Sequence, residues 1–153
     1  PTPTPGGPTN TPTATPTGPT ATPTSEIPTA TPTSGGCDTL GVTLEMPAHD
    51  FGPNDLCNTK VYICNPGSSM GETPLFVILD VFGELMFAPA FNDFDYYRIN
   101  LLSGQQTKTV LPDFNWPAGA GTANGIFWYA GMTNPEMSTL LGEMDSWEFS
   151  WYE

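Results

Sequence analysis

The stretch FGPNDLCNTKVYICNPG, residues 51–67, places alternating apolar side chains between two turn signals. The alternating side chains are Thr59, Val61 and Ile63. Gly52-Pro53-Asn54-Asp55 precedes them and Asn65-Pro66-Gly67 follows them. A period of two is typical of a strand with one buried face, and Gly, Pro, Asn and Asp end such runs. The stretch predicts a half-buried β-strand between two turns.

The same pattern recurs through residues 37–153. Apolar side chains alternate at Leu40, Val42, Leu44 and Met46, and again at Trp147, Phe149 and Trp151, which predicts two more strands with these side chains in the core. Residues 75–82 are more continuously apolar, which predicts a central strand covered on both faces. Further turn signals lie at 103–104, 117–121 and 124–125. Short strands separated by turns predict an all-β domain, an antiparallel β-sandwich with immunoglobulin-like topology.

One short helix is also expected in this domain. Thr133-Asn134-Pro135-Glu136 supplies a cap residue, a proline suited to a first turn and an early acid. Met137, Leu140 and Leu141 follow at helical spacing, and Gly142 would end the helix. We expect it to cover one end of the sandwich.

Residues 1–36, the Pro/Thr segment, differ sharply from the rest. They contain 13 Thr, 10 Pro, no aromatic residue and one charged residue, Glu26, and the composition changes at Ser34-Gly35-Gly36. So few large apolar side chains cannot form a core, and the recurring prolines favour extended polyproline II. The segment is predicted to be a linker or stalk before a domain at 37–153. Its composition is also that of O-glycosylated stalks, and the candidate acceptors are Thr13, Thr15, Thr17, Thr20, Thr22, Thr24, Thr29, Thr31 and Thr33.

A resemblance can be named from the first stretch. The order Phe51-Gly52-Pro53-Asn54-Asp55, a strand, then Asn65-Pro66-Gly67 resembles the F-x-P-G-D … N-x-G opening of immunoglobulin-like adhesion-type modules of secreted bacterial proteins. Asn54 stands where that family usually has glycine. The resemblance covers some 20 residues and implies a non-catalytic module joined to a larger exported protein through a Pro/Thr-rich linker.

Three cysteines suggest an exported protein, in a compartment where disulfides persist. Cys57 and Cys64 would lie about 23 Å apart along one strand, too far to bond to each other. We expect Cys37 to bond to one of them. The third thiol is then either buried as a small apolar side chain or used in a bond between subunits.

The charge and the lengths of the apolar stretches exclude two classes of partner. Sixteen acidic and three basic residues give a formal net charge of −13, so binding to nucleic acid is excluded, because that affinity depends on Lys and Arg. No stretch reaches the roughly 18 apolar residues of a membrane helix, so membrane insertion is not expected.

The sequence predicts no catalytic residue. A Ser-His-Asp arrangement would have to use His49, the single histidine, and the abundant carboxylates do not single out a hydrolytic pair. No cofactor is expected except possible calcium, which takes clustered oxygen ligands. The candidate ligands form two clusters, Asp50, Asn54 and Asp55, and Asn92, Asp93 and Asp95.

Aromatic side chains are the remaining lead. The candidates for contact with a partner are Tyr96, Tyr97, Trp116 and Tyr152.

The first hypothesis is a non-catalytic, self-assembling subunit of an extracellular or cell-surface fibre or layer, in which the Pro/Thr segment contacts the next copy. The alternative is a carbohydrate-binding or adhesive module tethered to a secreted protein, with glycans as partners.

Overall fold

The computed structural model describes residues 37–153, in which the chain forms nine β-strands and no helix. No helix long and apolar enough to cross a membrane occurs in these residues. The predictions made for 1–36, the domain boundary and the nine candidate threonines included, lie outside the described residues. The strands are β1 (Gly41–Glu45), β2 (Asp50–Phe51), β3 (Leu56–Asn65), β4 (Gly71–Val81), β5 (Glu84–Phe87), β6 (Tyr97–Leu101), β7 (Gly104–Asn115), β8 (Ala123–Thr133) and β9 (Leu140–Trp151).

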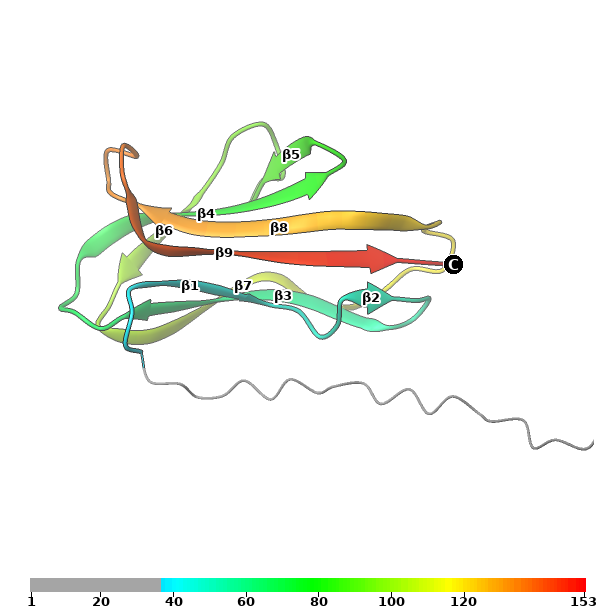
Figure 1. Cartoon of the computed structure of the whole chain (residues 1–153), viewed down its shortest axis with the longest axis horizontal. Coiled ribbons are helices and arrows are strands. Elements are labelled where there is room, and N and C mark those ends of the chain that lie inside the picture. Colours follow the sequence, from blue (N-terminus) through cyan, green and yellow to red (C-terminus); the bar gives the residue numbers. More distant parts are fainter. Residues whose placement is uncertain (1–36) are drawn as a thin grey trace, which may run out of the picture. The chain divides into compact units, whose positions relative to one another are not determined.

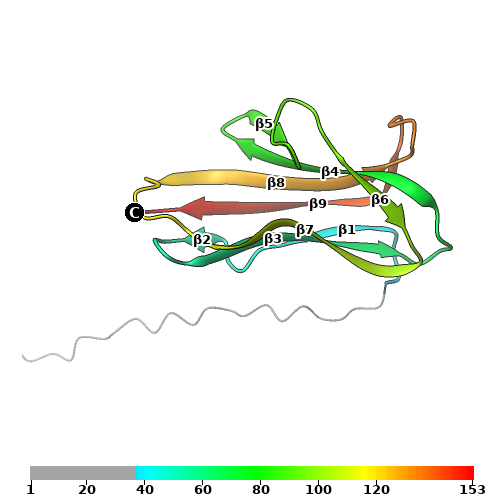
Figure 2. The ribbon, with the colours of Figure 1, turned by 180° about the vertical axis from the view of Figure 1, so that it is seen from behind.

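The strands form two packed layers, which Figures 1 and 2 show from opposite sides. One layer is β1, β3 and β7; the other is β4, β8 and β9, with β5 and β6 along the remaining edge of β4. The sheet runs in the order β5-β4-β8-β9-β1-β3-β7, so it is continuous and folds over onto itself. The predicted all-β sandwich with immunoglobulin-like topology is confirmed.

Strand β9 joins the two layers by parallel pairing. Gly41 of β1 pairs with Glu143, and at the other end Asp50 of β2 pairs with Ser150. A Cβ on Gly41 would lie 2.9 Å from backbone atoms of Glu143, so only glycine permits this approach. The predicted antiparallel sandwich thus also contains two short parallel pairings, because the first strand is split and its second part changes partner from β3 to β9.

A single hydrophobic core lies between the layers. Leu44 and Val61 enter it from one layer, and Val77, Trp128 and Phe149 from the other. The alternation that predicted these strands is therefore the alternation of core and outer side chains. Of the three aromatic side chains of β9, Phe149 is buried, while Trp147 and Trp151 are half-buried at the border of the core.

The predicted helix is wrong. Residues 134–139 form the turn of a hairpin, because β8 and β9 pair as far as Thr133 and Leu140 and leave no length for a helix. The side chain of Asn134 accepts hydrogen bonds from the amides of Ser138 and Thr139, at 2.8 and 3.0 Å. An asparagine that can cap a helix can equally close a turn by the same bonds.

The turn signal at 124–125 is also misplaced, because both residues lie inside β8. They form a bulge opposite β9, between the pairs Ala123 with Trp151 and Ile126 with Phe149. Gly125 has a φ of 69°, which is the left-handed conformation of one class of bulge.

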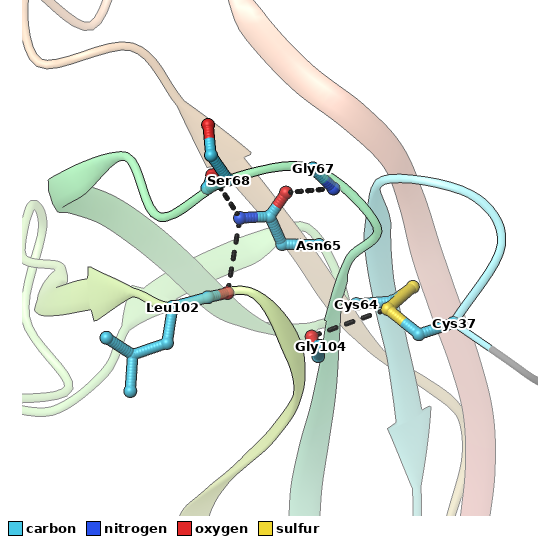
Figure 3. Close-up of a disulfide and its surroundings, with 7 residues drawn as sticks. All are labelled: Cys37, Cys64, Asn65, Gly67, Ser68, Leu102 and Gly104. Atoms are coloured by element: carbon cyan, nitrogen blue, oxygen red, sulfur yellow. Dashed lines mark hydrogen bonds between the residues drawn. A yellow bond between two sulfur atoms is a disulfide. The ribbon is translucent and has the colours of Figure 1, made fainter.

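The turns at the two ends of β3 follow the quoted motifs. Asn54 has a φ of 68°, a conformation that asparagine tolerates better than most residues and that glycine adopts freely. The carboxylate of Asp55 accepts a hydrogen bond from the Gly52 amide at 2.7 Å. At the other end, buried Asn65 accepts from the Gly67 amide and donates to the carbonyls of Ser68 and Leu102 (Figure 3). These contacts give each motif residue a role in the turn.

The disulfide joins Cys37 to Cys64, whose Cα atoms lie 5.2 Å apart (Figure 3). It ties the start of the described chain to the end of β3. Of the two expected partners of Cys37, which are Cys57 and Cys64, Cys64 forms the bond. A disulfide of this kind persists in oxidising compartments.

Cys57 is the third cysteine and lies fully buried in the core. Of its two predicted fates, the structure shows burial as a small apolar side chain. Burial raises the pKa of the Cys57 thiol to about 11, which keeps it protonated at neutral pH.

We predict that removing the disulfide lowers the free energy of unfolding by about 3 kcal/mol, because 27 residues separate the two cysteines and the bond restricts the unfolded chain. Urea unfolding of the oxidised and reduced chain measures this difference. A variant with Cys37→Ser and Cys64→Ser is the control, and reductant should not alter it. Equal stability of the oxidised and reduced chains would refute the bridge.

We also predict that native Cys57 is nearly inert toward thiol reagents at pH 8. Its pKa of about 11 leaves roughly one hundredth of the thiolate of an ordinary cysteine, and the sulfur is shielded by the core. Titration with a chromogenic disulfide reagent should detect no thiol in the native chain and one per chain in denaturant. Rapid labelling of the native chain would contradict this burial.

Candidate functional site: an aromatic sheet face

Strand β4 directs apolar side chains to two opposite faces. Leu75 and Val77 are fully buried between the layers. Phe76 and Ile78 alternate with them, so they point away from the core. No element of residues 37–153 buries them fully, and both stay partly exposed. The prediction that this strand is central is confirmed, but the prediction that both faces are covered is wrong within the described residues.

The outward side chains of β4 belong to a larger apolar surface, which we call the aromatic face. It gathers side chains from β4, β5, β8 and β9 and from the segment after β5. Its members are Phe76, Ile78, Phe87, Phe94, Tyr96, Tyr129, Leu140 and Met144. Phe94, Leu140 and Met144 are 59%, 55% and 52% exposed. The face is therefore accessible to a partner.

Four rings form the centre of one half of the face. The Phe76 ring centroid lies 5.4 Å from that of Tyr96 and 5.8 Å from that of Phe94. Phe87 lies 6.4 Å from Phe76 and 5.8 Å from Phe94. These separations are those of favourable aromatic pairs, so the rings hold one another in place outside the core.

A shallow groove of about 170 Å³ crosses the other half of the face. Phe76, Ile78 and Tyr129 line it on the side of β4 and β8, and Leu140 and Met144 line it on the side of β9. Gly131 lies in its lining, where an added Cβ would approach the Met144 Cγ to 3.0 Å. The missing side chain at 131 thus makes room for Met144 beside the groove.

Acidic groups and one base surround this apolar surface. Asp80 and Glu148 are paired across β8 with Phe127, whose ring is stacked at 6.0 Å on that of Tyr129. Arg98 lies over the Tyr96 ring at 5.7 Å and forms an exposed ion pair with Glu72 at 3.4 Å. The border is therefore mainly negative, with a positive charge at the Tyr96 corner.

The structure brings one of the four predicted contact aromatics, Tyr96, into this face. Tyr97 is half-buried against the core, with the Lys108 ammonium 4.3 Å from its ring centroid. Burial, and after it the charge of Asp95, raises the pKa of Tyr97. Trp116 packs between Phe51 and Trp151, and exposed Tyr152 lies against Gly52. Trp116 and Tyr152 thus contact residues of β2, β9 and the turn after β2, none of which belongs to the aromatic face.

Three of the six candidate calcium ligands accept hydrogen bonds from backbone amides in turns. Asp55 accepts from the Gly52 amide, as described above, and Asp95 accepts from the amides of Ala90 and Tyr96 at 3.0 and 2.9 Å. Asn92 accepts from the Phe94 amide at 3.2 Å. Among residues 37–153, no group of three His, Cys, Asp or Glu side chains is placed to hold a metal ion. The geometry of Asp50, Asn54, Asp55, Asn92, Asp93 and Asp95 therefore adds no support to the calcium prediction.

His49 has a structural environment. Its ring is stacked on Trp147 with centroids 4.2 Å apart, and its Nδ1 lies 2.6 Å from the Glu148 carbonyl oxygen. Its own carbonyl accepts a hydrogen bond from Ser150 at the start of the β2–β9 pairing. These contacts match a polar residue at a strand end.

The similarity of this chain to known proteins lies in its structure. No protein-family model and no curated protein matches the chain. Among solved structures, the chain is similar to the CARDB domain of a Pyrococcus furiosus protein, crystallised in complex with di-metal ions, at 17% identity. The TM-score is 0.47, and the alignment covers 74% of this chain and 94% of that domain. The fold assignment above therefore rests on the strand pairing of this chain.

We predict that the aromatic face is dispensable for folding. Replacing exposed Phe94 and Met144 together by serine should lower the free energy of unfolding by less than about 1 kcal/mol. Trp128→Ala, on the core side of β8, should lower it by about 3 to 5 kcal/mol. Urea unfolding compares the two variants. Equal losses would show that the face belongs to the folding core.

Proposed function

We propose that residues 37–153 are a non-catalytic module of an exported protein, and that the chain assembles with other copies in an extracellular or cell-surface fibre or layer. The observation that carries the proposal is the aromatic face. It supplies an apolar contact surface that the fold itself does not use.

A contiguous apolar patch of this kind favours a binding role. Single exposed apolar residues are ordinary on protein surfaces, but a contiguous patch bordered by charges is typical of interaction sites. Aromatic residues and methionine are enriched at the centres of protein interfaces, and charged residues are depleted there. The aromatic face has this composition, with Phe76 and Tyr129 near its centre and Glu72 and Glu148 beyond it.

The groove favours binding over catalysis. The side chains that line it are phenylalanine, tyrosine, isoleucine, alanine, leucine and methionine. Apart from the phenol of Tyr129, none of them belongs to the usual acids, bases and nucleophiles of active sites, such as a carboxylate, imidazole, thiol or amine. Asp80 lies near the aromatic face, but its carboxylate accepts a hydrogen bond from the Gly83 amide at 2.7 Å in a turn.

Export is supported by the Cys37–Cys64 disulfide, because such bonds persist mainly outside the reducing cytosol. The resemblance of the two turn motifs to adhesion-type modules agrees with that location. The two lines of support are independent, since one is a covalent bond and the other is a sequence pattern.

A carbohydrate-binding module is the second candidate. Tyr96 and Tyr129 present rings with polar tips on an open sheet, and such rings can stack on sugars. Sugar sites also need polar groups that converge on the hydroxyls, and the lining of the groove provides few. We therefore rank assembly first.

We predict that the full chain associates with increasing concentration and that a face variant, Phe94→Ser with Met144→Ser, does not. The matched control is Leu56→Ser with Leu102→Ser, because both leucines are 52% exposed and lie outside the aromatic face. Sedimentation velocity over a concentration series measures the association, and electron microscopy identifies fibres or layers.

Two results would refute the assembly proposal. One is a full chain that stays monomeric, and the other is a face variant that associates as well as the unaltered chain. Saturable binding of a monomer to glycans, lost in the face variant, would establish the carbohydrate alternative instead.

A further inference from the structure

The geometry points to a specific occupant for the aromatic face: we propose that the Pro/Thr segment, residues 1–36, of a neighbouring copy binds there. The inference rests on the proposed function and names the contact through which the copies would associate. It draws on the charge of the domain, the chemistry of the segment and the place where the segment joins the domain.

Charge argues against two aromatic faces packing on each other. Residues 37–153 carry 15 acidic and 3 basic residues, a formal charge of −12. Two identical faces would also bring Glu72, Asp80 and Glu148 of each copy toward the same groups of the other, and like charges at an interface are costly. The Pro/Thr segment has Glu26 as its single charge, so it can approach the face with little repulsion.

The chemistry of the segment suits the groove. Proline-rich chains favour polyproline II, whose conformation is largely set before binding, and they dock into aromatic-lined grooves. The sequence Pro-Thr-Ala-Thr-Pro-Thr occurs three times, at 12–17, 19–24 and 28–33. Proline rings can pack on Phe76 and Tyr129, and Ile27 is a large apolar residue available for the pocket beside Met144.

The attachment point and the length of the segment allow it to reach a neighbouring copy, as the proposed assembly requires. The segment joins the domain at Cys37, which the disulfide holds to Cys64 in the β1-β3-β7 layer. The aromatic face is the outer side of the other layer, so the core separates it from this attachment point. An extended segment of 36 residues spans on the order of 110 Å at 3.1 Å per residue, and a strand of 12 residues such as β9 spans about 40 Å. The segment is long enough to cross the domain of another copy.

The test uses three full-length chains made without glycosylation. The first is the face variant, Phe94→Ser with Met144→Ser. The second is a segment variant that keeps its length and threonines but has serine at Pro12, Pro16, Pro19, Pro23, Pro28 and Pro32. The third is the control, Leu56→Ser with Leu102→Ser.

Each variant alone should raise the dissociation constant of self-association by about tenfold or more, the effect expected when one side of an interface loses its central contacts. The control should associate as the unaltered chain does. An equimolar mixture of the face variant and the segment variant should recover association as a heterodimer, because one chain supplies an intact segment and the other an intact face. Sedimentation velocity with one partner fluorescently labelled measures this recovery.

The outcomes separate this inference from the function on which it rests. If the face variant fails to associate but the segment variant associates normally, the inference is overturned and assembly through the face stands. If both variants fail and the mixture does not recover, a neighbouring segment is not the occupant and the inference is likewise overturned. If the face variant associates normally, both the inference and the proposed function fail.

Discussion

Side chains alternate across a β-strand, so strand β4 presents apolar side chains on two faces, and each face needs a surface to pack against. Its apolar residues cannot all face one core. Leu75 and Val77 enter the space between the two layers, where Trp128 and Phe149 meet them. Phe76 and Ile78 must then point the other way. The fold satisfies the first pair and leaves the second pair open, and the proposed function follows from that difference.

The outer side of β4 belongs to the aromatic face, whose side chains are held in place by specific contacts. Gly131 makes room for Met144, and Phe76 and the three rings around it hold one another. Asp95 fixes the segment that carries Tyr96, because its carboxylate accepts hydrogen bonds from the Ala90 and Tyr96 amides. These contacts organise apolar side chains that contribute little to the core. The apolar surface of these side chains can therefore be buried by a partner. An uncharged partner suits this face, because Glu72, Asp80 and Glu148 lie at its border.

Local patterns in the sequence predict four of the nine strands, β1, β3, β4 and β9, because alternation and turn residues act over a few positions. The motif turns at Asn54 and Asn65 were predictable for the same reason. The helix expected at 133–142 is a hairpin turn instead, because an asparagine that can cap a helix can also close a hairpin. The pairing of Thr133 with Leu140 requires the hairpin. The aromatic face depends on register between distant strands, which places Tyr129 beside Ile78. Its one local signal is the continuous apolar run at 75–82, a pattern that is equally typical of a strand covered on both faces.

The central claim is that a partner covers the aromatic face when copies associate. The most direct measurement is methyl NMR of the methionines as the full chain is concentrated, because Met144 lies in the face while Met70 and Met137 are 51% and 42% exposed outside it. The account predicts that the Met144 methyl signal shifts or broadens with association, while those of Met70 and Met137 stay in place. An unchanged Met144 signal in the associated protein would contradict it.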